Sequence, residues 1–68
     1  MEEKIMYVVQ RADGKFYWKH PAFDNVDGYD SFDKAYLFSI KRSAQFIVDY
    51  GNEEQECKVK RVKLTLID

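Results

Sequence analysis

An unbroken run of apolar and aromatic side chains, Ile5 to Val9, predicts a first strand over residues 4–11. Ile5 and Val9 fall on one face of such a strand, whereas Met6 and Val8 fall on the other. Both faces therefore carry apolar groups, which is more typical of a strand inside a sheet than of an edge strand. We expect this strand to have a neighbour on each side.

A tight turn and a second strand follow. Asp13-Gly14 separates the first strand from the run Lys15–Lys19, and glycine readily adopts the positive φ that short hairpin turns require. Within that run Phe16 and Trp18 share one face, and Lys15, Tyr17 and Lys19 share the reverse. The pattern predicts an antiparallel hairpin at the amino end of the chain.

Residues 20–30 are rich in turn-forming side chains and are predicted to be a loop. Pro21 disfavours helical backbone at the residue before it, and Asp27-Gly28 is a turn-forming pair. Ser31 then stands where it can cap one short helical turn. The apolar triplet at residues 36–38 is predicted either as a short strand or as the buried entry to a helix.

Helical periodicity follows that triplet. Four apolar residues recur at the spacing of a core-facing stripe: Ile40, Ala44, Ile47 and Val48. Phe46 and Tyr50, which are four residues apart, widen the apolar face. Ser39 is the expected N-cap, and Gly51-Asn52 is the expected left-handed stop at the other end.

The last strand is predicted from Cys57 to about Ile67. Cys57 and Val59 share one parity, whereas the later apolar positions, from Val62 onward, share the other. The change at residues 60–61 indicates either a bulge or a strand whose two halves serve different faces. With the hairpin and the helix, this strand predicts an α+β fold: a small antiparallel sheet of three or four strands packed against one helix.

Length and composition narrow the class of protein. The 68 residues suffice for one domain, and 46% hydrophobic and 16% aromatic residues are typical of a folded chain. The single cysteine, Cys57, excludes an intramolecular disulfide and any cysteine-based zinc site. Because small extracellular folds usually depend on disulfides, we expect a cytoplasmic protein. The sequence has no apolar segment of a secretory signal and no apolar run approaching about 18 residues, so we expect no membrane association.

The residues that could support catalysis or bind a metal lack the partners that such chemistry requires. His20 is the single histidine, and the nearest carboxylate in its predicted loop is Asp24. Residues 24–30 are dense in oxygen ligands, but their spacing does not match a calcium-binding loop. The spacing of Ser31 and Lys34 matches the Ser-x-x-Lys motif of penicillin-binding proteins, but the sequence lacks the Ser-Asp-Asn and Lys-Thr-Gly elements that accompany that motif. We therefore predict a non-enzymatic protein with no cofactor and no metal.

Charge is distributed unevenly, although the net charge is only −1. Four aspartates and no Lys or Arg lie within residues 20–33, and four cations and no acid lie within residues 58–63. Solvated surface is the ordinary explanation for both runs. The negative total argues against a general nucleic-acid binder, and the general enrichment of Tyr and Trp at protein interfaces favours protein contact for the exposed aromatic residues.

Two functional hypotheses follow, with a third concerning self-association. The leading one is partner binding through the acidic loop, in imitation of nucleic-acid phosphate. Its residues are Asp24, Asp27, Tyr29 and Asp30. The alternative is a small single-stranded nucleic-acid-binding protein that uses an aromatic and basic sheet face. Its residues are Lys15, Trp18, Lys19, Lys58, Lys60, Arg61 and Lys63. The third is a homodimer formed through the exposed edge of the last strand.

Several features appear in one order along nearly the whole chain: Tyr7-Val8-Val9, Asp13-Gly14-Lys15-Phe16-Tyr17, Phe32-Asp33-Lys34-Ala35-Tyr36-Leu37-Phe38, and Ser43-Ala44 in a helix before a last strand. This order resembles short uncharacterised proteins of phages and prophages. The resemblance implies a protein of the host-cell cytoplasm that acts stoichiometrically on host machinery, including CRISPR and restriction systems. The expected function is inhibition of a host defence or nucleic-acid-processing protein by surface binding.

Overall fold

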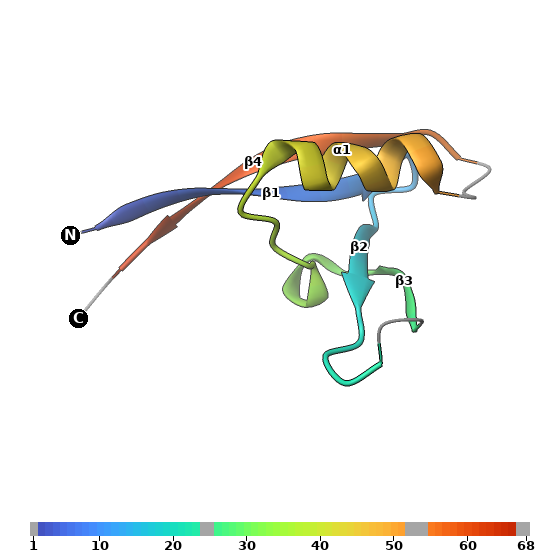
Figure 1. Ribbon diagram of the computed structural model, residues 1–68, viewed down its shortest axis with the longest axis horizontal. Coiled ribbons are helices and arrows are strands. Elements are labelled where there is room, and N and C mark those ends of the chain that lie inside the picture. The colour runs from blue at the N-terminus through green and yellow to red at the C-terminus, as the bar shows by residue number, and fades with distance from the viewer. Residues whose placement is uncertain (1, 24–25, 52–54, 67–68) are drawn as a thin grey trace.

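Two long antiparallel strands form the backbone of the fold. The computed structural model describes residues 2–23, 26–51 and 55–66. Strand β1 (Glu3–Arg11) pairs along its whole length with strand β4 (Cys57–Thr65). The pairing predicts a ribbon that is long relative to the rest of the chain, and Figure 1 shows that it is the longest feature of the molecule.

Two short strands and one helix complete the architecture. Strand β2 (Phe16–Lys19) pairs with β3 (Asp27–Asp30), and the sheet order is β3-β2-β1-β4. Helix α1 (Lys41–Tyr50) lies over β1 and β4 and runs along them, as Figure 1 shows. A 3-10 turn, η1 (Phe32–Lys34), precedes the helix. The predicted α+β fold, a four-stranded antiparallel sheet packed against one helix, is confirmed.

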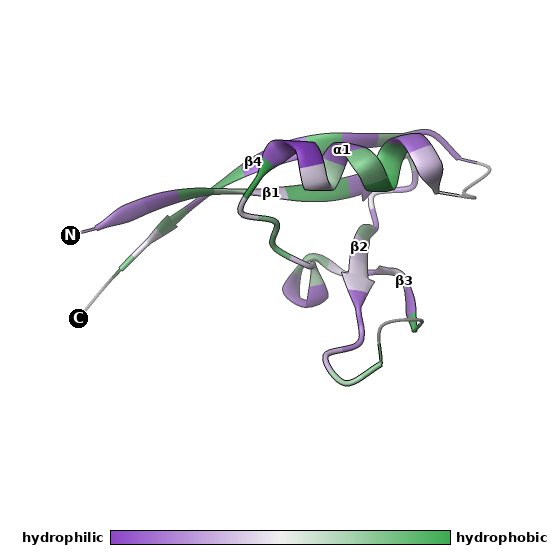
Figure 2. Cartoon of the chain, in the orientation of Figure 1, coloured by the Kyte–Doolittle hydropathy of each residue, from purple (hydrophilic) through white to green (hydrophobic). Residues whose placement is uncertain are grey.

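Strand β1 is central, as the apolar groups on both of its faces predict. Val8 and Val9 are both fully buried although adjacent strand residues point to opposite faces. Val9 belongs to the cluster beneath α1, together with Tyr17, Phe38 and Ala44. Ala44 has no exposed surface, and its small side chain permits close approach of the helix to the sheet. In Figure 2 the apolar colouring is concentrated along the middle of β1 and on α1.

The predicted turn at Gly14 is confirmed, but the hairpin pairing is short. Gly14 has φ of 91° and donates its N–H to the carbonyl of Arg11 at 2.9 Å. The paired register of β1 with β2 is limited to Gln10 opposite Phe16. Beyond this point β2 and β3 run across the direction of β1 (Figure 1).

The apolar triplet at residues 36–38 fills the space that opens between β1 and β2. Phe38 and Tyr7 exchange two backbone hydrogen bonds of 2.8 Å, and Tyr36 donates its N–H to the carbonyl of Tyr17 at 2.9 Å. The Phe38 ring is buried and stacks on the Tyr17 ring with centroids 6.0 Å apart. Of the two interpretations left open for this triplet, a strand-like bridge describes it.

Part of the predicted loop is a strand. Residues 27–30 form β3, in which Tyr29 lies opposite Tyr17 and Gly28 lies opposite Trp18. A Cβ at Gly28 would lie 3.5 Å from the Trp18 indole nitrogen, which is an ordinary van der Waals contact, so the indole ring does not require glycine there. The turn-forming pair Asp27-Gly28 does not form a loop, because pairing with β2 outweighs the local turn preference of these residues. Asp24 lies outside the described residues.

The helix and its end at Gly51 are confirmed, but the predicted N-cap and the predicted left-handed conformation of Gly51 are wrong. The N-cap is Ile40, not Ser39, and no side-chain capping bond is present there. Gly51 is extended, with φ of −75°, so it is not a left-handed stop; its N–H still donates to Ile47 at 3.0 Å. Asn52 lies outside the described residues. Ile40 was expected in the core stripe and is exposed instead, at the N-cap position that follows the Phe38 bridge to β1.

Strand β4 contains no bulge, since its register with β1 is unbroken from Glu3–Thr65 to Arg11–Cys57. Val59 packs with the cluster beneath α1, whereas Val62 lies opposite Met6 on the other face. The two halves of the strand therefore serve different faces, which was the second of the two interpretations. The strand ends before Ile67, which lies outside the described residues.

The short helical turn before α1 is confirmed as η1. Ser31 occupies its N-cap position, but the hydroxyl bonds to the Asp33 carboxylate rather than to a backbone N–H. Within the described ranges, no helix has the length and apolar character needed to cross a bilayer. The radius of gyration of 12.3 Å exceeds the value of about 11 Å expected for a globular chain of this length, because the β1–β4 ribbon projects beyond α1.

Candidate functional site

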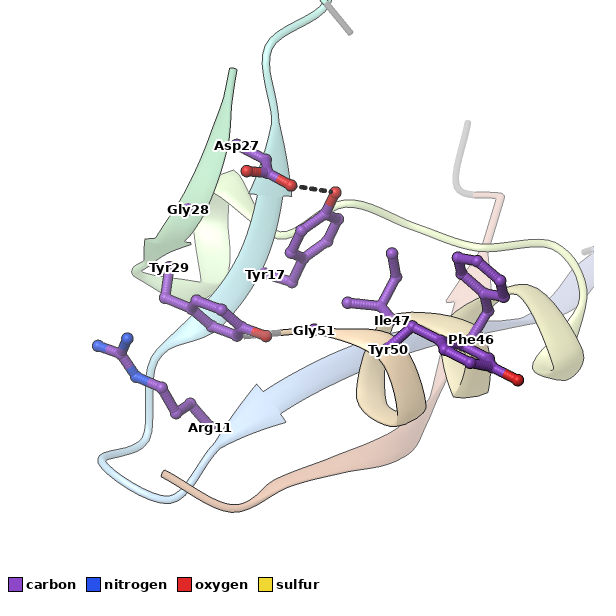
Figure 3. Close-up of a pocket in the computed structure, with 9 residues that line it drawn as sticks. All are labelled: Arg11, Tyr17, Asp27, Gly28, Tyr29, Phe46, Ile47, Tyr50 and Gly51. Carbon is purple, nitrogen blue, oxygen red and sulfur yellow. Dashed lines mark hydrogen bonds between the residues drawn. The ribbon is translucent and has the colours of Figure 1, made fainter. Parts of the chain in front are cut away.

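An open groove of about 520 Å³ lies between α1 and the strands β2 and β3 (Figure 3). Its lining residues are Arg11, Tyr17, Asp27, Gly28, Tyr29, Phe46, Ile47, Tyr50 and Gly51. The groove exists because β2 and β3 turn away from β1, so that the helix covers only the β1–β4 part of the sheet. Side chains from three separate parts of the chain meet there.

Tyr17 and Asp27 form the polar wall of the groove. The buried Tyr17 hydroxyl donates a hydrogen bond of 2.9 Å to the Asp27 carboxylate. Burial, and then this hydrogen bond, raise the pKa of Tyr17 to about 12. The phenol therefore stays protonated at neutral pH, where it serves as a donor that holds the carboxylate in place.

Tyr29 and Arg11 form the end of the groove. The Arg11 guanidinium lies 4.7 Å from the centre of the Tyr29 ring, a cation–π geometry. Arg11 also makes two hydrogen bonds to the Asp13 carboxylate, of 3.1 and 2.7 Å. Those bonds, with the Lys15 backbone N–H, lower the pKa of Asp13 to about 2. The Tyr29 hydroxyl lies 3.4 Å from the Cys57 sulfur, so this end of the groove is held by side-chain contacts.

Phe46 and Tyr50 form the helix side of the groove and are its most exposed part. Their side chains are 59% and 72% exposed, and their ring centroids are 4.7 Å apart. The sequence pattern predicts that this pair widens the buried face, and in the structure the pair faces the groove and solvent (Figure 3). Exposed aromatic pairs beside a fixed polar group are typical of protein contact surfaces.

The acidic residues assigned to partner binding do not share one surface. Asp27 and Tyr29 line the groove. Asp30 pairs with Lys34 at 3.5 Å, and its carboxylate accepts the Ser31 N–H at 2.7 Å. The Ser31 bond, followed by the Lys34 charge, lowers the pKa of Asp30. Because neighbouring strand positions alternate, Asp30 faces away from the groove.

The basic residues assigned to nucleic-acid binding are also divided. Strand alternation places Lys58 and Lys60 on the face of the sheet away from α1. Phe16 lies on the same face, because Gln10 is the register partner of both Lys58 and Phe16. It places Arg61 and Lys63 on the opposite face. The other members, Lys15, Trp18 and Lys19, belong to the β1–β2 turn and to β2. They do not form a single platform with all four cations of β4.

The remaining reactive side chains have ordinary local roles. His20 accepts the Ala22 N–H through Nδ1 at 3.0 Å, and its ring contacts Phe23 at 4.9 Å between centroids. The thiol of Cys57 lies beside Tyr29 and the Gln55 carbonyl. In the part of the chain that the structure describes, no three His, Cys, Asp or Glu residues are placed to hold a metal ion.

Sequence reasoning found Asp27 and Tyr29 but missed three features of the groove. Tyr17 was placed only by strand parity, and Arg11 was not assigned any binding role. Phe46 and Tyr50 were treated as core. Their signal was their position beside, rather than within, the stripe that contains Ala44.

Comparison with protein-family models, with curated proteins and with solved structures found no match for this chain. The resemblance to phage and prophage proteins therefore stays an expectation, and the case for function rests on the groove and the surfaces around it.

Proposed function

We propose that this protein is a non-enzymatic interaction protein and that the groove between α1 and β2–β3 is its contact surface for a partner protein. One observation carries the proposal: the exposed pair Phe46 and Tyr50 stands across the groove from an Asp27 carboxylate that is held by Tyr17. Aromatic anchors around a fixed polar group are the usual centre of a protein interface.

The groove is also suited to binding because its walls are preorganised. Tyr17 is buried and bonded to Asp27, and both belong to paired strands. Tyr29 is held by Arg11 and by the Cys57 contact. A partner would therefore order few side chains on this protein, and little of the binding energy would be lost to entropy.

The resemblance to phage proteins extends the proposal to the kind of partner. The partner is a host defence or nucleic-acid-processing protein in the cytoplasm, which this protein blocks by occupying its surface. Asp27 supplies the negative group that would face a basic site on such a partner. Imitation of phosphate then depends chiefly on Asp27, because Asp30 is paired with Lys34.

A random peptide library selected against the immobilised protein tests this contact surface. We expect the selected peptides to bind the wild type and to lose at least about tenfold in affinity on Tyr50→Ala or Phe46→Ala. Phe23→Ala is the matched control, because Phe23 is similarly exposed and lies outside the groove. Equal binding to all three variants would refute the groove as the contact surface.

Single-stranded nucleic-acid binding is a second candidate. It is favoured by the shared face of Lys58, Lys60 and Phe16 near the β1–β2 junction. Titration of Trp18 fluorescence with single-stranded DNA and RNA at low salt tests it, because phosphate contacts are strongest there. A flat titration would eliminate this candidate.

A further inference from the structure

The outer edge of β4 presents, along a long strand, backbone groups that pair with no other described strand. In the order β3-β2-β1-β4, this strand has a neighbour on one side only among the described residues. Leu66 donates its N–H to the Glu2 carbonyl at 2.8 Å, and bonded and non-bonded pairs alternate in an antiparallel ladder. The backbone N–H and C=O groups of Val59, Arg61 and Lys63 therefore point away from β1.

Positive charge flanks this edge on both faces of the sheet. Lys58 and Lys60 lie on one face, and Arg61 and Lys63 lie on the other. All four side chains are exposed. Lys63 pairs with Glu3 at 3.2 Å, and Lys58 reaches Glu56 only at 4.0 Å. Within the described ranges, Lys60 and Arg61 make no ion pair.

We propose that the β4 edge binds an acidic extended segment of a partner protein, which adds to the sheet as a fifth strand. The backbone groups of Val59, Arg61 and Lys63 provide the hydrogen bonds of the added ladder. Carboxylates on the incoming strand meet a cation on either face, and such cross-strand pairs are favourable. This surface is separate from the groove and goes beyond the function proposed above.

Charge selects this occupant over a second copy of the chain. Antiparallel pairing of two β4 edges would bring the cations of residues 58–63 beside the same cations of the other copy. Lysine on an edge strand discourages pairing with apolar or basic strands in this way, but it attracts an acidic one. The β4 edge therefore favours pairing with an acidic strand over pairing with an apolar or basic strand.

Geometry selects a polypeptide over single-stranded nucleic acid. Stacking proteins gather cations and aromatic rings on one sheet face, whereas β4 divides its four cations equally between two faces. A nucleic-acid backbone also lacks the alternating amide donors and acceptors that the edge requires.

Amide hydrogen exchange of the whole protein, followed by NMR, tests the proposal with a synthetic peptide. The probe is a nine-residue peptide that repeats Glu-Glu-Val three times, which places glutamates on both faces of a strand and matches the nine residues of β4. We expect the amides of Val59, Arg61 and Lys63 to exchange at least about tenfold more slowly when the peptide is bound. Added salt should weaken the effect.

Control peptides separate strand addition from simple charge attraction. The same peptide with lysine in place of glutamate should give no protection. An acidic peptide in which every amide is N-methylated keeps its charge but has no N–H to donate from either edge, so it cannot complete the ladder and should also give no protection. Arg61→Pro removes an outward N–H as well as the charge, so it should bind more weakly than Arg61→Gln. Phe46→Ala should bind normally, which distinguishes this edge from the groove.

Four outcomes would overturn the proposal. The first is unchanged exchange of the three amides with the acidic peptide, and the second is equal protection by the lysine peptide. The third is protection by oligothymidylate but not by peptide, which would assign the edge to nucleic acid. The fourth is protection that appears at high protein concentration with no peptide, which would assign it to a second copy.

Discussion

The middle and the outer end of the β1–β4 ribbon share one register but differ in what covers them. In the middle, Val8 and Val9 are fully buried on opposite faces, and α1 lies over one of those faces. At the outer end, Ile5 and Leu64 are partly exposed and Leu66 is 62% exposed. The hydrogen-bonded pairing is continuous through both regions. Pairing alone therefore does not decide stability here; the side chains packed on the strands do.

The largest test of this comparison is Phe38→Ala. Phe38 bridges Tyr7 and stacks on Tyr17, so its removal opens a cavity where β1 and β2 separate. We expect a loss of about 3–5 kcal/mol in the free energy of unfolding, which leaves a chain of this size largely unfolded. Circular dichroism with urea titration measures it. A loss below about 1 kcal/mol would show that the middle is not held by this packing.

Val8→Ala tests the face of β1 that α1 does not cover. Val8 has no exposed surface, so we expect a loss of about 2 kcal/mol in the free energy of unfolding. Urea denaturation measures this loss, with Ile5→Ala as the control on the same strand. Equal losses in the free energy of unfolding for the two substitutions would contradict the contrast between the middle and the outer end of the ribbon.

Alkaline pH should lower the stability of the middle of the molecule, because the buried phenol of Tyr17 loses its proton there. The pKa of this phenol is raised to about 12 in the folded protein, chiefly by burial, above its ordinary value of 10. The unfolded chain therefore loses the Tyr17 proton first, and the contribution of Tyr17 to stability, fully present below pH 10, declines as pH rises towards about 12. Urea titrations across this pH range should show a smaller decline in the free energy of unfolding for Tyr17→Phe than for the wild type. Equal slopes in both proteins would contradict the assignment.

The smallest effect is expected at the outer end of the ribbon. Leu64→Ala should change the free energy of unfolding by no more than about 0.5 kcal/mol, because the side chain has little packing to lose. Amide hydrogen exchange compares the two regions directly, because the backbone N–H groups of Lys4 and Val8 both point toward β4 in equivalent positions of the ladder. The Lys4 amide should exchange much faster than that of Val8. Equal rates would mean that the ribbon opens as one unit.

Local pattern was sufficient where a single element explains the residues. The apolar groups on both faces of β1 predicted its central place, and Gly14 predicted the turn. The spacing of Ala44, Ile47 and Val48 predicted the helix. These signals depend on periodicity over a few residues, which survives in the fold because packing and propensity agree there.

The candidate site was less readable, since only Asp27 and Tyr29 of the groove were named from the sequence. Tyr17 acquires its role from a hydrogen bond across two strands, and Tyr50 from its place beside Phe46 on the helix side of the groove. Neither fact has a local signature. Asp27 itself was assigned to a loop, although pairing with β2 makes it part of a strand.

The amino-acid sequence by itself determined the identity of the main elements: a central strand, a turn, a helix with an apolar stripe, and a basic final strand. Only the tertiary structure decided that residues 27–30 pair with β2, that Phe38 enters between β1 and β2, and that Phe46 remains exposed. The physical reason is the range of the forces involved. Periodicity and turn chemistry act within a few residues, whereas strand partners and side-chain exposure depend on which distant surfaces compete for the same contact.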